Sequence, residues 1–244
     1  MKVYGLIGYP LSHSFSKGFF AEKFTKENIK DCIYDNFPLP TIKELTSLLK
    51  DKPELCGLNV TIPYKQAVIP YLDELSPAAA QIKAVNCIRF IDGVKTGFNT
   101  DAIGFRRSLE PLLKSHHTNA LVLGTGGAAK AVQYVLEALN IPYKLVSRKM
   151  APGAVTYDQL DADVMEENTI IINTTPLGMY PNEDAAPEIP YQFLSSQHLL
   201  YDLIYNPATT SFLQQGKEKG ATIKNGHEML ILQAEASWEI WNDL

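Results

Sequence analysis

The sequence predicts an α/β protein made of two domains, each with a sheet of largely parallel strands covered by helices. Short apolar runs alternate with amphipathic segments along the whole chain of 244 residues, as in repeated βαβ units. The alternation comes in two series that separate near residue 100. In addition, a chain of this length can bury two ordinary hydrophobic cores.

The first series holds strands, helices and a hairpin. Its strand candidates are short apolar runs at residues 3–8, 32–37 and 55–62. Its helix candidates are amphipathic segments at about residues 16–27 and 41–50. An Asp-Gly dipeptide at residues 92–93 suits the type I′ turn of a β-hairpin between two further runs, 84–91 and 94–98. A last helix is expected from Asp101 towards Leu113.

The second series alternates in the same way after a polar break at residues 114–119. Its strand candidates are apolar runs at residues 119–124, 143–147, 170–175, 199–205 and 221–225. A helix of small and apolar residues is expected at 128–139, directly after the first of these strands. Residues 227–241 form a final helix with apolar residues on several faces. This order is typical of a parallel sheet with helices packed outside it.

Composition and charge exclude several classes of protein. The formal net charge is −5, so there is no general basic surface and nucleic acid is not expected as a partner. No run approaches the roughly 20 apolar residues of a membrane span. The cysteines are odd in number and widely separated, without a C-x-x-C, which favours a reducing compartment over disulfides or a zinc site. We expect a soluble, cytoplasmic protein without a metal.

Residues 57–65, GLNVTIPYK, place polar side chains in an unusual pattern for a strand. Alternation along a strand predicts that the apolar members face the core: Leu58, Val60 and Ile62. Asn59 and Thr61 then face the other way, and Lys65 follows beyond Pro63. A half-buried strand with a hydrated outer face is one explanation. The other is a row of hydrogen-bonding groups that binds a polyhydroxylated ligand.

A glycine-rich turn, VLGTGGAAKA, lies at residues 122–131, where the second series begins. It gives G-x-G-x-x-A, at Gly124, Gly126 and Ala129, between a predicted strand and a predicted helix. This is the context that a dinucleotide-binding turn requires. Gly124 permits the tight turn, Gly126 lets the backbone approach a pyrophosphate, and the helix N-terminus supplies N–H groups. The alternative is a tight βα turn without a ligand.

The end of the following strand indicates which dinucleotide is bound. An NAD site usually carries Asp or Glu there, to hold the ribose 2′-hydroxyl. This chain has Ser147, Arg148 and Lys149 instead. Arg and Lys attract a 2′-phosphate that a carboxylate would repel, so NADP is favoured over NAD. A basic pair in a loop can also be ordinary solvated surface.

Further candidate ligand groups lie at strand ends and turns of the first series. Ser12 and Ser14 follow the first strand, where hydroxyls can receive a carboxylate, although serines beside a proline are also common turn residues. Asn86 lies in the segment AVNC. Asp101, in GFNTDAIGF, carries a carboxylate, but Asp is also a frequent helix N-cap.

Together these motifs resemble those of the shikimate dehydrogenase family, in order and from one end of the chain to the other. The segments that carry the resemblance are G-x-P-x-x-H-S at 8–14, N-V-T-x-P-x-K at 59–65, A-V-N at 84–86, N-T-D at 99–101, G-x-G-G-A at 124–128, D-x-x-Y-N-P at 202–207 and G-x-x-M-L-x-x-Q at 226–233. The family usually carries Asn-Arg-Thr where this chain has residues 147–149, and Arg148 keeps the position that reads the phosphate.

The resemblance implies a two-domain enzyme that reduces 3-dehydroshikimate to shikimate with NADPH, reversibly, in the pathway to chorismate and the aromatic amino acids. It implies that residues 1–101 and about 227–244 form an α/β substrate-binding domain. Residues 102–226 would form a Rossmann-type, doubly wound NADP-binding domain, with the active-site cleft between the two. We expect a small-molecule substrate, no nucleic acid or membrane as partner, and a monomer or a homodimer.

The resemblance also assigns roles by position. Lys65 is expected to be the acid/base, and Asp101 to orient it and to bind the reacting hydroxyl. The substrate carboxylate is assigned to Ser12, Ser14 and Tyr205. The ring hydroxyls are assigned to Asn59, Thr61, Asn86 and Gln233, together with Lys65 and Asp101. The cofactor is assigned to Gly124, Gly126, Gly127, Ala128, Ser147, Arg148, Lys149, Asn173, Thr174, Leu203, Gly226 and Met229, the last three of them near the nicotinamide.

Two other functions stay open at this point. A quinate or quinate/shikimate dehydrogenase that uses NAD would differ by one ring hydroxyl of its substrate and by the loop around Arg148. A sensor that binds a dinucleotide and a metabolite without catalysis would need no proton donor, so Lys65 and Asp101 argue against it.

The histidines form no H-E-x-x-H or comparable metal-binding spacing.

Overall fold

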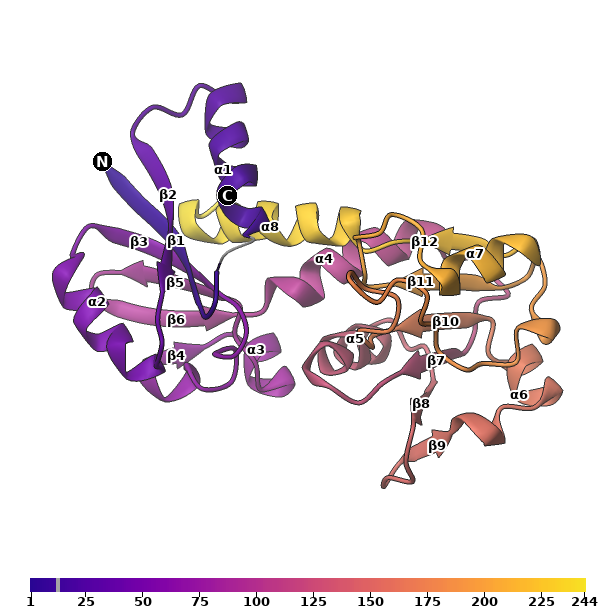
Figure 1. Cartoon of the computed structure of the whole chain (residues 1–244). Helices are drawn as coiled ribbons and strands as arrows, with labels where there is room; N and C mark the ends of the chain where they lie inside the picture. The colour runs from indigo at the N-terminus through magenta and orange to yellow at the C-terminus, as the bar shows by residue number, and fades with distance from the viewer. Residues whose placement is uncertain (12–13) are drawn as a thin grey trace. The chain divides into compact units, whose positions relative to one another are not determined.

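The structure is a computed structural model that describes residues 1–11 and 14–244, and these form two compact units (Figure 1). The first unit consists of Met1–Ile103 and Gln233–Leu244, and the second of Gly104–Leu232. The chain passes from one unit to the other within two helices, α4 (Thr100–Leu109) and α8 (His227–Asn242). The domain boundaries expected from the sequence, at residues 101 and about 227, lie in the same two helices.

The first unit is built on a mixed sheet with the strand order β2-β1-β3-β5-β6-β4. Its strands are β1 (Lys2–Gly8), β2 (Cys32–Pro38), β3 (Leu55–Val60), β4 (Glu74–Leu75), β5 (Cys87–Ile91) and β6 (Val94–Phe98). β2, β1 and β3 run parallel, as the sequence predicts, whereas β5 runs antiparallel to β3 and β6. Its helical segments are α1 (Phe15–Lys26), α2 (Leu45–Asp51), α3 (Pro77–Ile82), the 3₁₀ turns Ile42–Glu44 and Ile69–Tyr71, and parts of α4 and α8.

The hairpin predicted at Asp92-Gly93 is confirmed. β5 and β6 pair antiparallel, with Ile91 opposite Val94. Asp92 and Gly93 both have positive φ angles, 48° and 81°, which is the conformation of a type I′ turn. The return strand ends at Phe98, so the hairpin delivers the N-T-D segment to the start of α4.

Strand β3 ends at Val60, earlier than the sequence predicts. Pro63 has no N–H and restricts the backbone of the residue before it, so the strand gives way to a turn. Leu58 and Val60 are buried as expected. Ile62 is 74% exposed, so its assignment to the core is wrong.

The face of β3 that carries Asn59 is covered by helix α8. A Cβ at Gly57 would lie 2.3 Å from the Trp241 ring, so only glycine fits beneath the helix. Trp241 stacks on Tyr4, with 4.8 Å between ring centroids, and donates from Nε1 to the Ile88 carbonyl at 3.0 Å. Asn59 is therefore only 5% exposed, and the alternative of a hydrated outer face is wrong.

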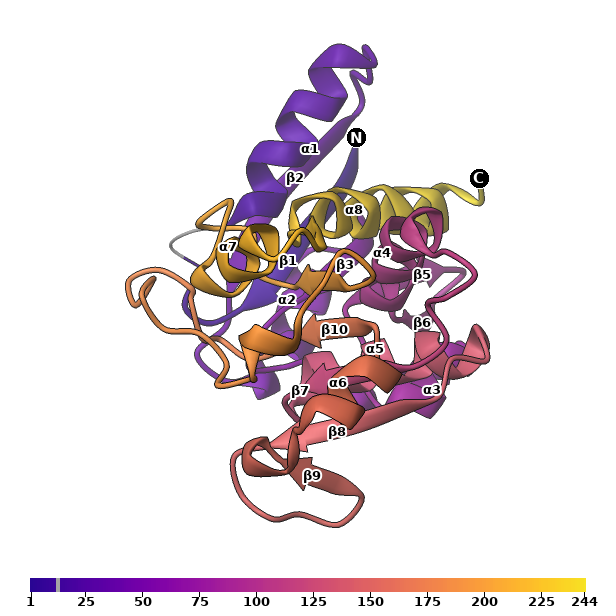
Figure 2. The same cartoon turned by 90° about the vertical axis from the view of Figure 1, so that its right-hand side faces the viewer.

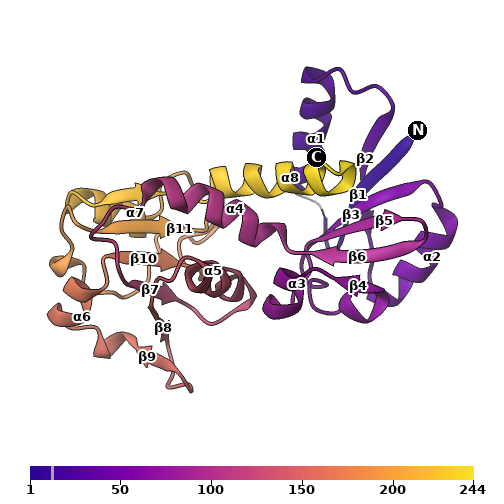
Figure 3. The same ribbon diagram turned by 180° about the vertical axis from the view of Figure 1, so that it is seen from behind.

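The second unit holds a parallel sheet with the order β12-β11-β10-β7-β8-β9, the doubly wound order of a Rossmann-type domain. Figure 2 labels β10, β7, β8 and β9 of this sheet. Its strands are β7 (Ala120–Leu123), β8 (Tyr143–Ser147), β9 (Ala154–Thr156), β10 (Ile170–Asn173), β11 (Leu199–Asp202) and β12 (Thr222–Lys224). Its helical segments are α5 (Gly127–Ala138), α6 (Ala162–Glu167), α7 (Ser211–Glu218) and the 3₁₀ turns Glu110–Leu112, Tyr157–Gln159 and Tyr191–Phe193. α5 packs against β7, as the view from behind shows (Figure 3).

Candidate active site

A lysine and an aspartate meet in the first unit. Nζ of Lys65 donates to Oδ2 of Asp101 at 2.7 Å. The other carboxylate oxygen of Asp101, Oδ1, accepts from Nδ2 of Asn86 at 2.9 Å. The side chains of Lys65 and Asp101 are 35% and 22% exposed, so the pair is shielded in part and still open to a ligand. The structure thus brings together three residues that the sequence analysis selects.

The backbone around Lys65 is anchored on both sides. The buried Tyr64 donates from its hydroxyl to the Leu39 carbonyl at 2.6 Å. The Lys65 carbonyl accepts from the Val85 N–H at 2.7 Å. These bonds fix the backbone from which the Lys65 side chain extends, and the contact with Asp101 holds the ammonium group itself.

Asp101 is available to Lys65 because another residue caps helix α4. The Asn99 side chain accepts from the Ala102 N–H at 3.1 Å and donates to the Ala84 carbonyl at 3.0 Å. Asn99 is therefore the N-cap, and the alternative that Asp101 caps the helix is wrong. Asp101 lies in the first turn of α4, where the helix dipole stabilises a negative charge.

Both amide hydrogens and the amide oxygen of Asn86 form hydrogen bonds within the protein. Nδ2 donates to Oδ1 of Asp101 and to Oγ1 of Thr100, both at 2.9 Å. Oδ1 of Asn86 accepts from the Thr100 N–H at 2.6 Å. Asn86 is 3% exposed and Thr100 is fully buried. In this structure the amide fixes the carboxylate of Asp101, and a bond from Asn86 to a ring hydroxyl stays a prediction.

Asn59 is held in a similar way on the neighbouring strand. Its Oδ1 accepts from the hydroxyl of Tyr34 at 2.9 Å. Its Nδ2 donates to the Asn86 carbonyl at 3.2 Å and to Oγ of Ser237 at 2.9 Å. Both amide hydrogens are thereby used, and only acceptor capacity on Oδ1 is left for a ligand.

Thr61 and Gln233 complete the polar group of the first unit. Thr61 is partly exposed, and its N–H donates to the Ile7 carbonyl at 2.9 Å. Its methyl group packs against Gly8, where a Cβ would lie 2.4 Å from Cγ2 of Thr61. Gln233 is 8% exposed, and its Oε1 accepts from the Thr100 hydroxyl at 3.5 Å. Both residues therefore belong to the same unit as the lysine–aspartate pair.

The residues assigned to the substrate carboxylate are placed differently. Ser12 lies outside the described residues. Ser14 is the N-cap of α1, and its hydroxyl accepts from the Lys17 N–H at 3.4 Å. Tyr205 belongs to the second unit and is 43% exposed. The assignment of these residues to a carboxylate stays a prediction.

The glycine-rich turn has the geometry that a pyrophosphate requires. Gly124 has a φ angle of 104°, and a Cβ there would lie 2.8 Å from Oγ1 of Thr174. Gly126 is the N-cap of α5, and a Cβ at Gly126 or Gly127 would meet no atom within 4 Å. Residues 126–128 are exposed, whereas Ala129 is fully buried against the sheet. The turn therefore offers the open N-terminus of a long helix to an anion.

The loop after β8 carries two exposed, positively charged side chains. The Ser147 hydroxyl donates to the Lys149 carbonyl at 2.6 Å and accepts from the Lys149 N–H at 3.2 Å, so it fixes the turn. Arg148 and Lys149 are exposed, and within residues 1–11 and 14–244 neither side chain forms an ion pair. Arg148 and Lys149 fit the 2′-phosphate of NADP, because their positive charges attract a phosphate. Neither side chain would have to leave an ion pair with an Asp or Glu of the described residues in order to bind it.

A buried carboxylate that the sequence analysis does not select organises two loops of the second unit. Asp202, at the end of β11, accepts from Nδ2 of Asn173 at 3.1 Å, the Ile204 N–H at 3.0 Å and the Thr210 hydroxyl at 2.6 Å. Burial raises the pKa of Asp202 to about 6, against these three donors. Asn173 is fully buried and turned towards Asp202, so the structure places its amide inside the protein. Any contact with the cofactor stays a prediction.

Thr174 and the Gly226 segment lie beside these loops in the second unit. The Thr174 hydroxyl donates to the Leu123 carbonyl at 2.7 Å, directly beneath the glycine-rich turn. The Gly226 N–H donates to the Ile204 carbonyl at 2.9 Å, and a Cβ at Gly226 would lie 2.1 Å from the Leu203 carbonyl oxygen. Gly226 and Leu203 are thus in close contact, and their place beside the nicotinamide stays a prediction. Met229 is partly exposed in the first turn of α8.

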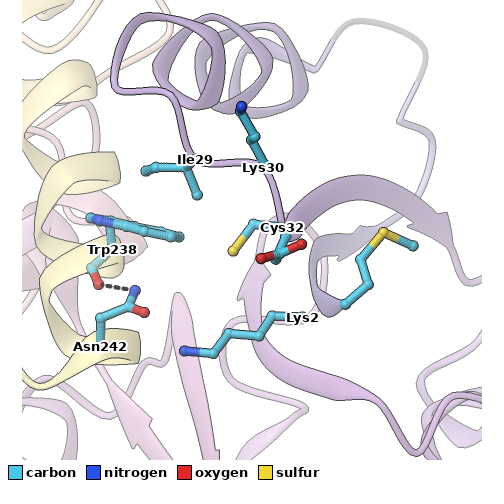
Figure 4. Close-up of a pocket in the computed structure, with 8 residues that line it drawn as sticks. Lys2, Ile29, Lys30, Cys32, Trp238 and Asn242 are labelled. Carbon is cyan, nitrogen blue, oxygen red and sulfur yellow. Dashed lines mark hydrogen bonds between the residues drawn. The ribbon is translucent and has the colours of Figure 1, made fainter.

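A separate surface cavity of about 380 Å³ opens in the first unit. Trp238 and Cys32 lie on opposite sides of it (Figure 4). Its other lining residues are Met1, Lys2, Ile29, Lys30, Asp31 and Asn242. None of them is a residue that the sequence analysis selects, and burial raises the pKa of the Cys32 thiol, which makes it less reactive. The cavity therefore shares no lining residue with the group around Lys65 and Asp101.

Within residues 1–11 and 14–244, no three His, Cys, Asp or Glu side chains gather in a way that could hold a metal ion. No helix in that part of the chain has the length and apolar character needed to cross a bilayer. Cys32, Cys56 and Cys87 are all free thiols.

Comparison with known proteins adds independent information. The sequence model of the shikimate dehydrogenase substrate binding domain matches residues 6–88. The NADP(+) shikimate dehydrogenase of Methanosphaera stadtmanae is 37% identical over 256 residues, covering 97% of this chain and 90% of the relative. A crystal structure of shikimate 5-dehydrogenase from Thermus thermophilus, in complex with NADP(H) and shikimate, has a TM-score of 0.87 at 28% identity and covers 100% of this chain and 94% of that one.

A similar fold also occurs in an enzyme with a different name. Quinate dehydrogenase from Corynebacterium glutamicum, in complex with NAD, has a TM-score of 0.87 at 26% identity. It covers 100% of this chain and 94% of that one. The same fold therefore occurs in a shikimate dehydrogenase and in a quinate dehydrogenase. The sequence identity of this chain is 37% to the NADP(+) shikimate dehydrogenase of Methanosphaera stadtmanae and 26% to the quinate dehydrogenase.

Proposed function

Because the chain belongs to the shikimate dehydrogenase family, we propose that it catalyses the reversible, NADPH-dependent reduction of 3-dehydroshikimate to shikimate through Lys65 and Asp101. The observation that carries these residue roles is the 2.7 Å contact between the ammonium and the carboxylate, in a partly exposed position of the first unit. An ammonium group can donate a proton, and the neighbouring carboxylate can hold both the ammonium and the reacting hydroxyl.

Reduction of the ketone requires a hydride at carbon and a proton at oxygen. NADPH, when bound, supplies the hydride. As negative charge develops on the carbonyl oxygen, Lys65 stabilises it and transfers a proton from Nζ to that oxygen. The resulting lysine amine takes a proton back from solvent. In the reverse direction, Lys65 as the free amine accepts the proton of the shikimate hydroxyl.

Asp101 fixes the direction of this transfer. Its Oδ2 accepts from Nζ of Lys65, and its Oδ1 is held by Asn86. The carboxylate cannot rotate without losing one of these bonds, so the ammonium stays in one place between turnovers. We propose that the reacting hydroxyl of shikimate hydrogen-bonds to this same carboxylate.

The remaining substrate contacts follow from the surroundings of the pair. We assign the ring hydroxyls to Thr61, Gln233, Asn59 and Asn86. Asn59 would accept a hydrogen bond from a ring hydroxyl at Oδ1. Asn86 would give up one of its hydrogen bonds within the protein to bind the ligand. We assign the substrate carboxylate to Ser12, Ser14 and Tyr205. A hydroxyl at the N-cap of α1 is suited to an anion because the helix N-terminus supplies a favourable dipole.

The cofactor contacts are assigned to the second unit. The open N-terminus of α5, with Gly124, Gly126, Gly127 and Ala128, would receive the pyrophosphate. Arg148 and Lys149, on a turn fixed by Ser147, would hold the 2′-phosphate. Asn173 and Thr174 would shape the loop beneath the cofactor, and Leu203, Gly226 and Met229 would border the nicotinamide. The exposed cations at 148 and 149 favour NADP over NAD.

We further propose that the enzyme acts in the cytoplasm, as a monomer or a homodimer. Three free cysteines are compatible with a reducing compartment.

The function is tested by mixing the purified protein with shikimate and following nicotinamide absorbance. NADP⁺ and NAD⁺ are assayed in parallel, and quinate is the second substrate. We expect reduction of NADP⁺ by shikimate with a much higher kcat/KM than any other combination. Equal rates with NAD⁺ or with quinate would move the assignment to a broader quinate/shikimate dehydrogenase. No reduction, with both ligands still bound, would indicate a sensor.

A further inference from the structure

One buried hydroxyl connects the polar groups around the lysine–aspartate pair. Ser237, on the last turns of α8, is fully buried. Its Oγ accepts from Nδ2 of Asn59 at 2.9 Å, donates to the Gln233 carbonyl at 2.9 Å, and lies 3.2 Å from Oγ1 of Thr100. The sequence analysis does not select Ser237.

The directions of these hydrogen bonds follow from counting protons. Ser237 donates its single proton to the Gln233 carbonyl. The Thr100 hydroxyl proton has three acceptors within reach: Oδ1 of Asn86 at 3.2 Å, Oγ of Ser237 at 3.2 Å and Oε1 of Gln233 at 3.5 Å. Thr100 Oγ1 then accepts from Nδ2 of Asn86. The other Nδ2 proton of Asn86 is directed to the carboxylate of Asp101. Thr100 thus connects the amide of Asn86 to Ser237 and Gln233 on α8.

Tyr34 fixes Asn59 from the opposite side. Its hydroxyl donates to Oδ1 of Asn59 at 2.9 Å. Tyr34 is 8% exposed, and burial raises its pKa, so the phenol keeps the proton that it donates to Oδ1 of Asn59. An amide flip at Asn59 would put its NH₂ group against the hydroxyl of Tyr34 and its carbonyl against the Asn86 carbonyl. The two partners therefore select one of the two amide orientations.

We propose that Ser237 and Tyr34 are positioning residues for the ring-hydroxyl site: they hold Asn59 so that it offers a substrate only an acceptor, and Ser237 also fixes Asn86 through Thr100. This inference rests on the proposed function, because it concerns the same substrate site. A ligand at Asn59 must then present a hydroxyl proton. Neither residue contacts the substrate or the cofactor in this account.

The test is Ser237→Ala, with Ser108→Ala as its matched control. Ser108 is also buried on a helix, bonds to the Gly104 carbonyl at 2.8 Å, and shares a 2.6 Å hydrogen bond with the hydroxyl of Tyr201. Both variants lose a buried hydroxyl of the same kind. We expect Ser237→Ala alone to raise the KM for shikimate on the order of 10-fold, because the Nδ2 donor of Asn59 loses a buried acceptor and the amide is held less firmly. The KM for NADP⁺ should stay unchanged in both variants.

Tyr34→Phe supplies a second, independent variant, with Tyr201→Phe as its control. Tyr201 is fully buried and, like Tyr34, bonds through its hydroxyl to a buried side chain. We expect Tyr34→Phe to weaken shikimate binding, measured by calorimetry and by KM, and Tyr201→Phe to lower the melting temperature only.

The outcomes separate this inference from the proposed function. If the wild-type protein does not oxidise shikimate, the proposed function is wrong. If the wild type is active but Ser237→Ala and Tyr34→Phe bind shikimate as it does, only the positioning role is wrong. Equal losses in the Ser108 and Ser237 variants would also overturn it, because they would point to a general loss of stability. If Ser237→Ala does not fold, Tyr34→Phe decides the question.

Discussion

Lys65 and Asp101 form a contact of 2.7 Å between Nζ and Oδ2, and the second oxygen of the same carboxylate is occupied by Asn86 at 2.9 Å. One oxygen of the Asp101 carboxylate thus contacts a cation, and the other contacts a buried amide. The rigid side rests on Thr100 and, beyond it, on Ser237 of α8. Lys65 is therefore held by a chain of hydrogen bonds whose last members come from the opposite end of the sequence.

Cofactor choice should depend on Arg148. Replacing it in Arg148→Gln removes a charge-assisted contact with the 2′-phosphate, so the KM for NADP⁺ should rise on the order of 10- to 100-fold. Activity with NAD⁺ should not fall. Lys144→Gln is the control, because Lys144 lies on β8, the strand that leads to Arg148, but is paired with Glu167 at 2.6 Å. Equal losses with NADP⁺ and NAD⁺ in Arg148→Gln would show that Arg148 does not read the phosphate.

The position of Thr61 should depend on Gly8. In Gly8→Ala the new methyl group would lie 2.4 Å from Cγ2 of Thr61 and 3.0 Å from the Ile62 carbonyl oxygen. We expect a loss of about 1–3 kcal/mol in the free energy of unfolding, together with a higher KM for shikimate. Gly18→Ala is the control, because no atom lies within 4 Å of its added Cβ and the residue is in helix α1. An unchanged KM in Gly8→Ala would remove Thr61 from the substrate site.

The free energy of unfolding of the second unit should depend on pH through the protonation of Asp202. Its pKa is raised from 3.8 to about 6 in the folded protein, mainly by burial. The folded state therefore holds a proton that the unfolded state has lost, and this contribution to stability is present below pH 3.8 and disappears as the pH rises through about 6.

Denaturant titration of Asp202→Asn against the wild type measures this contribution. The difference in free energy of unfolding between the two proteins should change between about pH 4 and 7, with the wild type losing stability relative to the variant as the pH rises. Asp163→Asn, at an exposed position in the first turn of α6, should show no such change. A constant difference across that range for Asp202→Asn would contradict the raised pKa.

Local sequence signals predicted much of the fold. The turn at Asp92-Gly93 needs positive φ angles at both residues, which Asp and Gly tolerate. The G-x-G-x-x-A turn needs a φ of 104° at its first glycine, Gly124. Such signals act within a few residues, so they are readable without the tertiary structure. The short strands β4 and β9 were missed because they carry no apolar run.

Burial of polar residues could not be predicted in the same way. Asn59 is covered because Ser237 and Trp241, far along the chain, pack over its strand. Its alternating pattern alone is equally consistent with a hydrated face. Likewise, both Asn99 and Asp101 are acceptable N-caps by residue type, and only the observed start of α4 decides between them.

The central claim is that Lys65 transfers the proton, and Lys65→Ala tests it most directly. Lys95→Ala is the matched control, since Lys95 forms a similar pair with Asp73 at 2.6 Å in the same unit. Turnover of shikimate with NADP⁺ is measured for both variants, and NADP⁺ binding is measured by calorimetry. The account predicts that Lys65→Ala lowers kcat by at least ~100-fold with NADP⁺ affinity unchanged, while Lys95→Ala behaves as the wild type. Near-normal turnover in Lys65→Ala would contradict it.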